Sequence, residues 1–145
     1  MLTLHSERML MYRYKGMIWT TDSFVGNTKY NVSVNKNSDN FPNKGSGTFR
    51  LYSRIAIQSA NNRWENPKFT VYYTDGTSEE IWTTSVVNSS TANIAGSSYT
   101  EYYDLNITFT TNKVPSYINF TGVPRSTSSS WPYCWIEKTY VEKIA

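Results

Sequence analysis

A chain of 145 residues has the length of one domain and can bury about two-thirds of its unfolded surface without disulfides. Its net charge of +3 comes from scattered basic residues with no run of four Lys or Arg, so we expect no nucleic-acid partner. Aromatic residues make up 16% of the chain and charged residues only 17%. Ser, Thr and Asn supply the remaining polar residues; Thr and Ser are tolerated on the wet faces of strands and Asn and Ser serve turns, so the composition favours β-structure.

The first 15 residues show neither a helical nor a strand period, and we expect residues 1–15 to form an arm that orders on a partner. Residues 16–145 are expected to form one domain. The N-terminus lacks the uninterrupted apolar core of a signal peptide, and no stretch approaches the ~20 apolar residues of a membrane span. We therefore expect synthesis in the cytosol and no membrane partner.

Alternating apolar and polar residues predict strands throughout this domain. In "KYNVSVN" (29–35), Tyr30, Val32 and Val34 share one face, and "DLNITFTT" (104–111) alternates most cleanly. Trp19 and Trp82 lie within predicted strands and are assigned to the core. The expected strands are 16–24, 29–35, 49–59, the two arms of 68–84, 104–111, 116–123 and 133–144.

The stretch "KFTVYYTDGTSEEIWTT" (68–84) predicts a β-hairpin that turns on Asp75-Gly76 as a two-residue loop. Phe69, Val71 and Ile81 are expected to point into the core. Seven to eight such strands, each with one buried and one wet face, predict an all-β fold. The long connections favour an antiparallel two-layer β-sandwich of jelly-roll type over a simple meander.

Catalytic and metal-binding residues are scarce. One histidine (His5) and one cysteine (Cys134) argue against a nucleophilic triad, a zinc site and an internal disulfide, and Cys134 is interpreted as buried filler. Asn35, Asn37 and Asp39 have the spacing of a calcium loop, but that loop's later Gly and Glu are missing, so we expect no metal and no cofactor. Carboxylates alone permit a glycan-cleaving enzyme, yet no pattern supports one, and we expect no enzyme.

Two loops carry the aromatic and basic residues that suit recognition: "SANNRWENP" (59–67) and "PRSTSSSWPY" (124–133). A loop Trp can stack beneath a sugar ring while Arg or Asn binds its hydroxyls, or it can anchor a protein interface. Alternatively, both Trp rings fold back and cap the sandwich. The predicted glycan- or partner-binding residues are Arg63, Trp64, Arg125, Trp131 and Tyr133.

The stretch "FRLYSRIAIQSANNRWENPKFTVYYTDGTSEEIW", then "DLNITFTTNKVPSYINFTGV" and the final "CWIEKTYVEKI", resembles galactose-binding-like jelly-roll domains over about residues 46–144. The resemblance implies that sugar contacts lie on loops. The chain departs from many secreted members in having one cysteine and no clear calcium loop. Its polar, β-only character also resembles small structural proteins of tailed bacteriophages, such as capsid decoration, fibre and tail accessory proteins.

These observations favour a non-enzymatic structural or docking β-sandwich of a larger assembly. We expect a bacteriophage virion component, with other virion proteins or copies of itself as partners. The alternative is a carbohydrate-binding module that recognises a cell-surface glycan, and a small glycan-cleaving enzyme is a third hypothesis.

Overall fold

The computed structural model describes residues 17–21, 32–58, 62–88, 100–126 and 133–145. These ranges contain strands and no helix. The strands are β1 (Met17–Thr21), β2 (Val34–Asn37), β3 (Gly47–Gln58), β4 (Asn62–Tyr73), β5 (Ser78–Thr83), β6 (Val86–Asn88), β7 (Thr100–Thr111), β8 (Pro115–Ser126) and β9 (Tyr133–Lys143). No helix long and apolar enough to cross a membrane occurs in these ranges.

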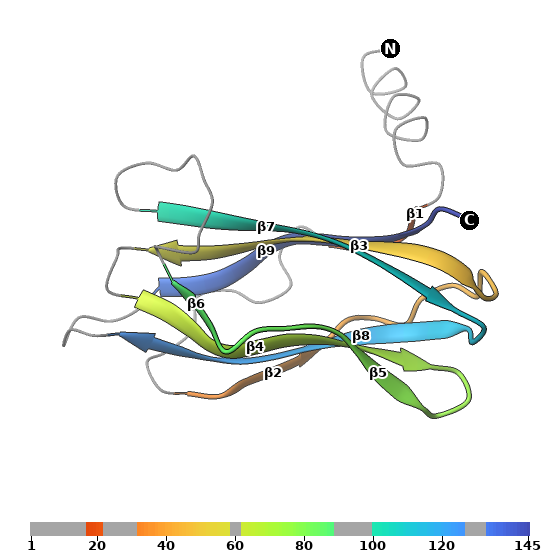
Figure 1. Cartoon of the computed structure of the whole chain (residues 1–145), viewed down its shortest axis with the longest axis horizontal. Helices are drawn as coiled ribbons and strands as arrows, with labels where there is room; N and C mark the ends of the chain where they lie inside the picture. The colour runs from red at the N-terminus through yellow and green to blue at the C-terminus, as the bar shows by residue number, and fades with distance from the viewer. Residues whose placement is uncertain (1–16, 22–31, 59–61, 89–99, 127–132) are drawn as a thin grey trace, which may run out of the picture.

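The strands form two antiparallel sheets that face each other (Figure 1). Sheet A has the order β1-β9-β3-β7, and sheet B has the order β2-β8-β4-β5, with β6 also paired to β4. Consecutive strands cross repeatedly from one sheet to the other, and only β4 and β5 form a hairpin of neighbours within a sheet. This is the jelly-roll arrangement, so the predicted fold class is confirmed. The described residues contain nine strands, more than the seven to eight expected, because the short β6 was not predicted from the sequence.

The core lies between the two inner faces, and its centre in sheet B is aromatic. The Trp64 ring meets the Phe120 ring edge to face, with centroids 5.1 Å apart at 85°, and Phe69 lies 5.3 Å from Phe120. On the sheet A side of the core, Ser53 and Thr139 are partners in β3 and β9, and their buried hydroxyls form a hydrogen bond of 2.8 Å. The predicted inward positions of 49–57, 69–73 and 105–109 are confirmed as buried or packed against the core.

The predicted hairpin of 68–84 is confirmed, but its loop is longer than two residues. Tyr73 N donates to Thr77 O at 2.9 Å, and Gly76 N donates to Tyr73 O at 3.0 Å. Gly76 has φ 84°, which completes a three-residue loop with a left-handed residue at its end. The Asp75 carboxylate accepts from Thr77 N at 2.9 Å and so favours this longer turn over the two-residue form.

Strand β4 is interrupted in the middle, and this interruption lets two strands share one of its edges. Asn66 has φ 48° and Pro67 lacks an N–H, and the β8 register shifts between Glu65 and Lys68. Residues 63–65 of β4, before the shift, pair with β6, and residues 68–72, after the shift, pair with β5. The bulge therefore lies across the middle of the sheet B surface.

Three boundary predictions were wrong. The loop expected over 124–133 overlaps two strands, because β8 continues to Ser126 and β9 begins at Tyr133. The strand expected over 29–35 begins only at Val34, and Val32 is 51% exposed because it precedes the sheet. The loop expected over 59–67 is already strand from Asn62, because alternate residues there face the core. The predicted arm, residues 1–15, lies outside the described residues and stays a prediction, as does the core assignment of the Trp19 side chain.

Candidate functional site

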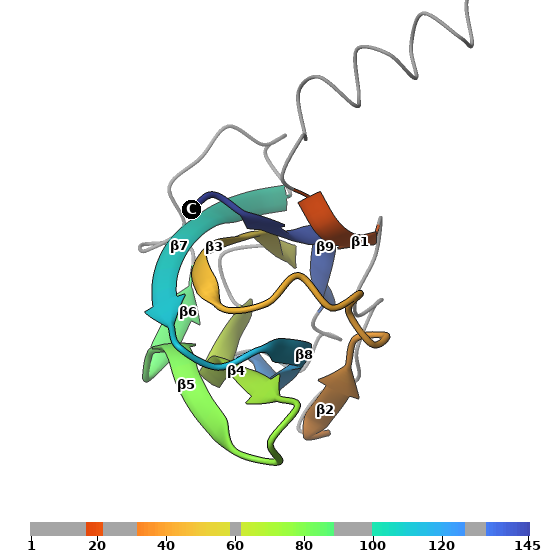
Figure 2. The same ribbon diagram turned by 90° about the vertical axis from the view of Figure 1, so that its right-hand side faces the viewer.

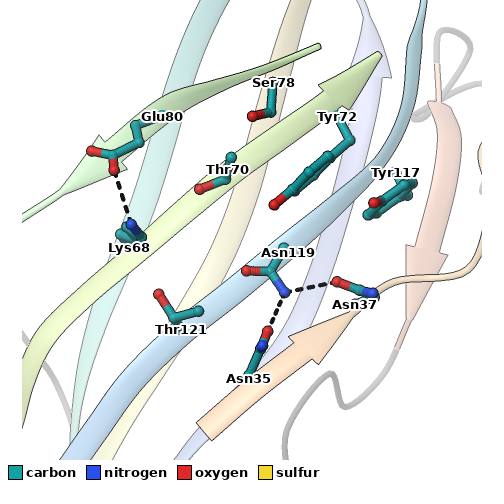
Figure 3. A pocket seen from close by; sticks show the side chains of 10 residues that line it. All are labelled: Asn35, Asn37, Lys68, Thr70, Tyr72, Ser78, Glu80, Tyr117, Asn119 and Thr121. Carbon is teal, nitrogen blue, oxygen red and sulfur yellow. Dashed lines mark hydrogen bonds and ion pairs between the residues drawn. The ribbon is translucent and has the colours of Figure 1, made fainter. Parts of the chain in front are cut away.

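The outer face of sheet B carries a polar groove of about 440 Å³ (Figure 3). Strands β4 and β8 form its floor, and β2 and β5 border it on either side and project away from sheet A (Figure 2). The lining residues are almost all polar: Asn35, Asn37, Lys68, Thr70, Tyr72, Ser78, Glu80, Tyr117, Asn119 and Thr121.

Strand register brings these residues together. In β4 the residues between the core positions Phe69, Val71 and Tyr73 point outward because side chains alternate along a strand. Their partners in β8 are also outward-facing. The pairs, in order along the groove, are Lys68 with Thr121, Thr70 with Asn119, and Tyr72 with Tyr117.

One end of the groove carries a tyrosine pair. The rings of Tyr72 and Tyr117 stack with centroids 4.6 Å apart and an interplanar angle of 6°. Both side chains are partly exposed and line the groove (Figure 3). A stacked pair is stiffer than a single tyrosine, so it offers a pre-ordered apolar surface with two hydroxyls.

Next to the tyrosines lies a cluster of three asparagine amides. Asn119 Nδ2 donates to Asn35 Oδ1 at 2.6 Å and to Asn37 Oδ1 at 2.7 Å (Figure 3). The amides of Asn35 and Asn37 lie on the edge strand β2, so these bonds tie the groove wall to its floor. Each amide has both donor and acceptor atoms, which is the chemistry that hydroxyl-rich ligands require.

The end of the groove opposite the tyrosine pair carries an ion pair between Lys68 and Glu80, whose Nζ and Oε1 lie 2.9 Å apart. A second hollow of about 520 Å³ continues from this pair towards Glu65 and Asn66. The two hollows have four lining residues in common, so they form one trough along sheet B. These residues are Asn35, Lys68, Glu80 and Thr121.

Glu65, which lines the second hollow, binds two arginines that lie beside the trough. Arg63 donates from Nε and Nη2 to Glu65 Oε1, at 3.1 and 2.6 Å, and Arg125 Nε donates to Glu65 Oε2. Partial burial raises the pKa of Glu65, but the hydrogen bonds from Arg125 and Arg63 outweigh it and hold that pKa below its ordinary value. Glu65 is therefore a fixed carboxylate.

Among the predicted site residues whose side chains the structure describes, Arg63 and Arg125 lie together. Arg63 and Arg125 are cross-strand partners in β4 and β8. Tyr133 lies in β9 of sheet A, opposite Gln58, and its side chain is outside the described part of the chain. Trp131 falls outside the described residues.

The prediction that Trp64 presents an exposed ring is wrong. Trp64 is 0% exposed and lies in β4, not in a loop. Its ring packs on Phe120 and over Gly122, where a Cβ would come within 3.0 Å of Trp64 Cε3. Alternation along β4 places Trp64 on the inner face because its neighbours Arg63 and Glu65 face outward.

The tyrosine pair and the amide cluster were not predicted from the sequence. Binding residues were expected on loops, whereas Tyr72, Tyr117 and Asn119 lie at outward positions of central strands. The outward alternation of "FTVYY" and "SYINF" is visible in the sequence, but their adjacency depends on the β4–β8 register.

The described residues offer no group of three or more His, Cys, Asp or Glu side chains that could hold a metal ion. The calcium-like spacing of Asn35, Asn37 and Asp39 does not form a loop, because Asn35 and Asn37 lie in β2 and bind Asn119. Cys134 is buried, as predicted, and burial raises the pKa of its thiol to about 12. It is thus a poor nucleophile.

The outer face of sheet A has a second tyrosine pair but a different charge arrangement. Tyr52 and Tyr140 stack with centroids 5.2 Å apart. The arginines on this face each have a carboxylate of their own: Arg50 lies 3.1 Å from Glu142, and Arg54 binds Asp104 through two hydrogen bonds of 2.7 and 3.1 Å.

No protein-family model and no curated protein matches the sequence. Among solved structures, a chain from infectious bursal disease virus, Gt strain, matches with a TM-score of 0.53 and 12% identity, over 88% of this chain and 33% of that one. A Gx strain chain matches with a TM-score of 0.52 and 12% identity, over 86% and 32%. The chain thus spans about a third of the length of these viral chains.

A xylan-binding domain of Paenibacillus barcinonensis Xyn10C matches over 89% of this chain and 96% of that one, at 10% identity and a TM-score of 0.42. This value is too low to establish a common fold, so the strand order and the viral chains carry that conclusion. The expected resemblance to jelly-roll domains is confirmed at the level of fold. The chain shares its fold with part of viral proteins, and these are not bacteriophage proteins.

Proposed function

We propose that this chain is a non-enzymatic binding module and that the trough on sheet B holds a carbohydrate chain. The observation that carries the proposal is the juxtaposition, in one open polar groove, of a stacked tyrosine pair and a cluster of three amides. A sugar ring has an apolar face of C–H groups and a rim of hydroxyls. The tyrosine pair matches the face, and the amides match the rim.

The shape of the site supports an extended ligand. The trough is open along the sheet and continues through a second hollow, which suits a polymer better than a small metabolite enclosed on all sides. Its floor is built on paired strands, so the binding groups are held in place before the ligand arrives and little ordering is needed on binding.

The carboxylates of the trough support the absence of catalysis. A glycosidase needs one carboxyl group with a raised pKa to protonate the leaving oxygen. Glu65 has a lowered pKa instead, and Glu80 is engaged with Lys68. If the chain were an enzyme, it would release reducing sugar from a polysaccharide, and Glu65→Gln or Glu80→Gln would abolish that release. We expect no release by the unaltered protein.

The test of carbohydrate binding uses the two tyrosine pairs as site and control. Affinity electrophoresis in gels containing plant and bacterial polysaccharides measures retardation of the unaltered protein. Tyr72→Ala with Tyr117→Ala should abolish retardation, because stacking on the groove is lost. Tyr52→Ala with Tyr140→Ala removes the matched pair on sheet A and should leave it unchanged. Equal retardation of both variants, or none of the unaltered protein by any polysaccharide, would refute the proposal.

A second candidate is a structural component of a bacteriophage particle, in which this sandwich docks onto other virion proteins or copies of itself. Its support is the fold shared with chains of infectious bursal disease virus. Light scattering on the purified chain tests it. A stable trimer or larger oligomer whose mass does not change with polysaccharide would favour this role. A monomer that binds polysaccharide would favour the carbohydrate-binding module.

A further inference from the structure

Resting on the carbohydrate-binding role proposed above, we infer that the amide cluster of Asn35, Asn37 and Asn119 is a subsite for the acetamido group of an N-acetylated sugar whose ring lies on the tyrosine pair. The inference concerns which carbohydrate is bound. It comes from the direction of the hydrogen bonds inside the cluster, because these bonds decide which atoms are left for a ligand.

The hydrogen bonds of the cluster leave donors on two asparagines and an acceptor on the third. An asparagine amide has two N–H donors on Nδ2 and one acceptor atom, Oδ1. Asn119 donates from Nδ2 to both Asn35 Oδ1 and Asn37 Oδ1, at 2.6 and 2.7 Å, which leaves its own Oδ1. Asn35 and Asn37 each use Oδ1 and keep Nδ2. Within the described part of the chain, these three remaining groups have no hydrogen-bond partner.

The orientation of the Asn119 amide is fixed by its two neighbours. Turning this amide by itself would bring Oδ1 to the position of Nδ2, against the oxygens of Asn35 and Asn37. Asn119 is also held in the floor of the groove, where it is only 7% exposed. An acceptor with so little access to water is unfavourable without a partner. The cluster therefore presents an acceptor of fixed direction beside two donor groups.

An acetamido group has the matching arrangement. Its N–H can only donate, its carbonyl oxygen can only accept, and its methyl group is apolar. The N–H would donate to Asn119 Oδ1, and the carbonyl oxygen would accept from Nδ2 of Asn35 or Asn37. A carboxylate only accepts and an ammonium group only donates, so each would leave one half of the cluster facing a group of its own kind. A hydroxyl binds in either sense and gains nothing from the fixed direction.

The surroundings of the cluster suit a neutral sugar. Among the ten residues that line the groove, only Lys68 and Glu80 are charged, and they form an ion pair with each other at the end opposite the tyrosines.

The spacing of the cluster from the tyrosine pair suits one sugar and its substituent. Asn119 follows Tyr117 by two positions on β8, so it lies on the same face about 7 Å along the strand. Figure 3 shows the amides next to the tyrosine rings. A sugar ring on the tyrosine pair can thus extend an acetamido substituent to the amides.

The probes separate the acetamido group from the rest of the sugar. Chitohexaose and cellohexaose share one backbone and differ only in whether each ring bears an acetamido group or a hydroxyl. Chondroitin and bacterial peptidoglycan strands supply other backbones, each compared before and after N-deacetylation and again after re-acetylation. Isothermal titration calorimetry gives the affinities. At least one N-acetylated ligand should bind about ten-fold or more tightly than its counterpart, because two directed hydrogen bonds are gained, and re-acetylation should restore this affinity.

Two isosteric variants with the same change in net charge test the subsite. Asn119→Asp replaces Nδ2 with a second carboxylate oxygen, so Asn35 and Asn37 must turn their Nδ2 groups inward and present Oδ1 to the groove. The preference for N-acetylated ligands should be abolished, because the ligand carbonyl then meets two oxygens. Asn106→Asp is the matched control, since Asn106 is exposed on β7 in sheet A, and it should retain the preference.

An independent test removes the free donors and leaves Asn119 in place. Asn35→Ala with Asn37→Ala should abolish the same preference. The readout for every variant is the ratio of affinities for the paired ligands, because a purely structural loss would weaken both ligands equally. Thermal unfolding followed by circular dichroism checks that the variants fold.

The remaining outcomes separate this inference from the proposed function. Binding of the N-acetylated ligands no tighter than that of their counterparts, and lost in the tyrosine variant, would overturn the inference and leave carbohydrate binding intact. A preference that Asn119→Asp retains, or that Asn106→Asp loses as well, would overturn the assignment of the acetamido group to the amide cluster. Absence of binding to any carbohydrate would overturn both.

Discussion

Replacing Trp64 with alanine tests whether this residue belongs to the core or to a binding surface. The side chain is 0% exposed, and its ring meets Phe120 edge to face at 5.1 Å. Truncation of a fully buried tryptophan removes its transfer free energy and leaves a cavity, which costs about 3–5 kcal/mol. We expect the upper half of this range, because Gly122 lies directly against the ring and leaves its neighbours little freedom to collapse. A domain with a total stability of about 5–15 kcal/mol would lose a large share of it.

Guanidinium chloride unfolding, followed by far-ultraviolet circular dichroism, measures this loss from the shift of the midpoint. Trp82→Ala is the matched control. Trp82 is only partly buried on β5, with its ring 6.1 Å from that of Phe69, so its truncation should cost about 1–2 kcal/mol. The folded fraction of Trp64→Ala should still bind any polysaccharide that the unaltered protein binds. An unchanged midpoint together with lost binding would refute the burial of Trp64.

Three further predictions concern the core and the trough. Gly122→Ala should lower the free energy of unfolding by about 1–3 kcal/mol, because the new Cβ would lie 3.0 Å from Trp64 and 3.1 Å from Phe120; an alanine variant as stable as the unaltered protein in guanidinium chloride would contradict this packing. Cys134, whose burial raises its pKa to about 12, should react with a thiol reagent such as dithionitrobenzoate only after denaturation, and rapid labelling of the folded protein would contradict that burial. The folded-state pKa of Glu65 is lowered, so the free energy that its ionised carboxylate contributes is complete above the unfolded-state pKa and is lost as pH falls through the folded-state pKa. Glu65→Gln should therefore reduce the loss of stability that the unaltered protein shows below about pH 5. An equal loss of stability in both proteins would refute this assignment.

Much of the fold could be predicted because the alternation of apolar and polar residues along a β-strand indicates which of its faces is buried. In β7, Leu105, Ile107 and Phe109 alternate with Asn and Thr, and each apolar residue is buried or packed on the core. The turn at Asp75-Gly76 was also predicted. Its loop is longer than the two residues expected, because Asp75 accepts hydrogen bonds from Thr77.

The candidate site was far less predictable from the sequence. Arg63 and Arg125 were expected on loops. They are cross-strand neighbours on one carboxylate because two strands far apart in the chain pair in register. Trp64 was misplaced because an apolar residue flanked by polar ones can belong to a loop or to a strand. Only the bulge at Asn66 and the presence of β8 decide between these alternatives.

The sequence by itself determined the local properties of this protein: strands with one apolar and one polar face, turns at Gly and Asp, and the small number of residues suited to catalysis. These properties depend on neighbours within a few positions in the sequence, so they can be predicted from short segments. The tertiary structure alone decided which outward faces become adjacent. The trough joins side chains from β2, β4, β5 and β8. Its tyrosine pair and its amide cluster, and the arginine pair beside it, each arise from register between strands distant in the chain. Long-range pairing is a property of the whole core, and no segment carries it alone.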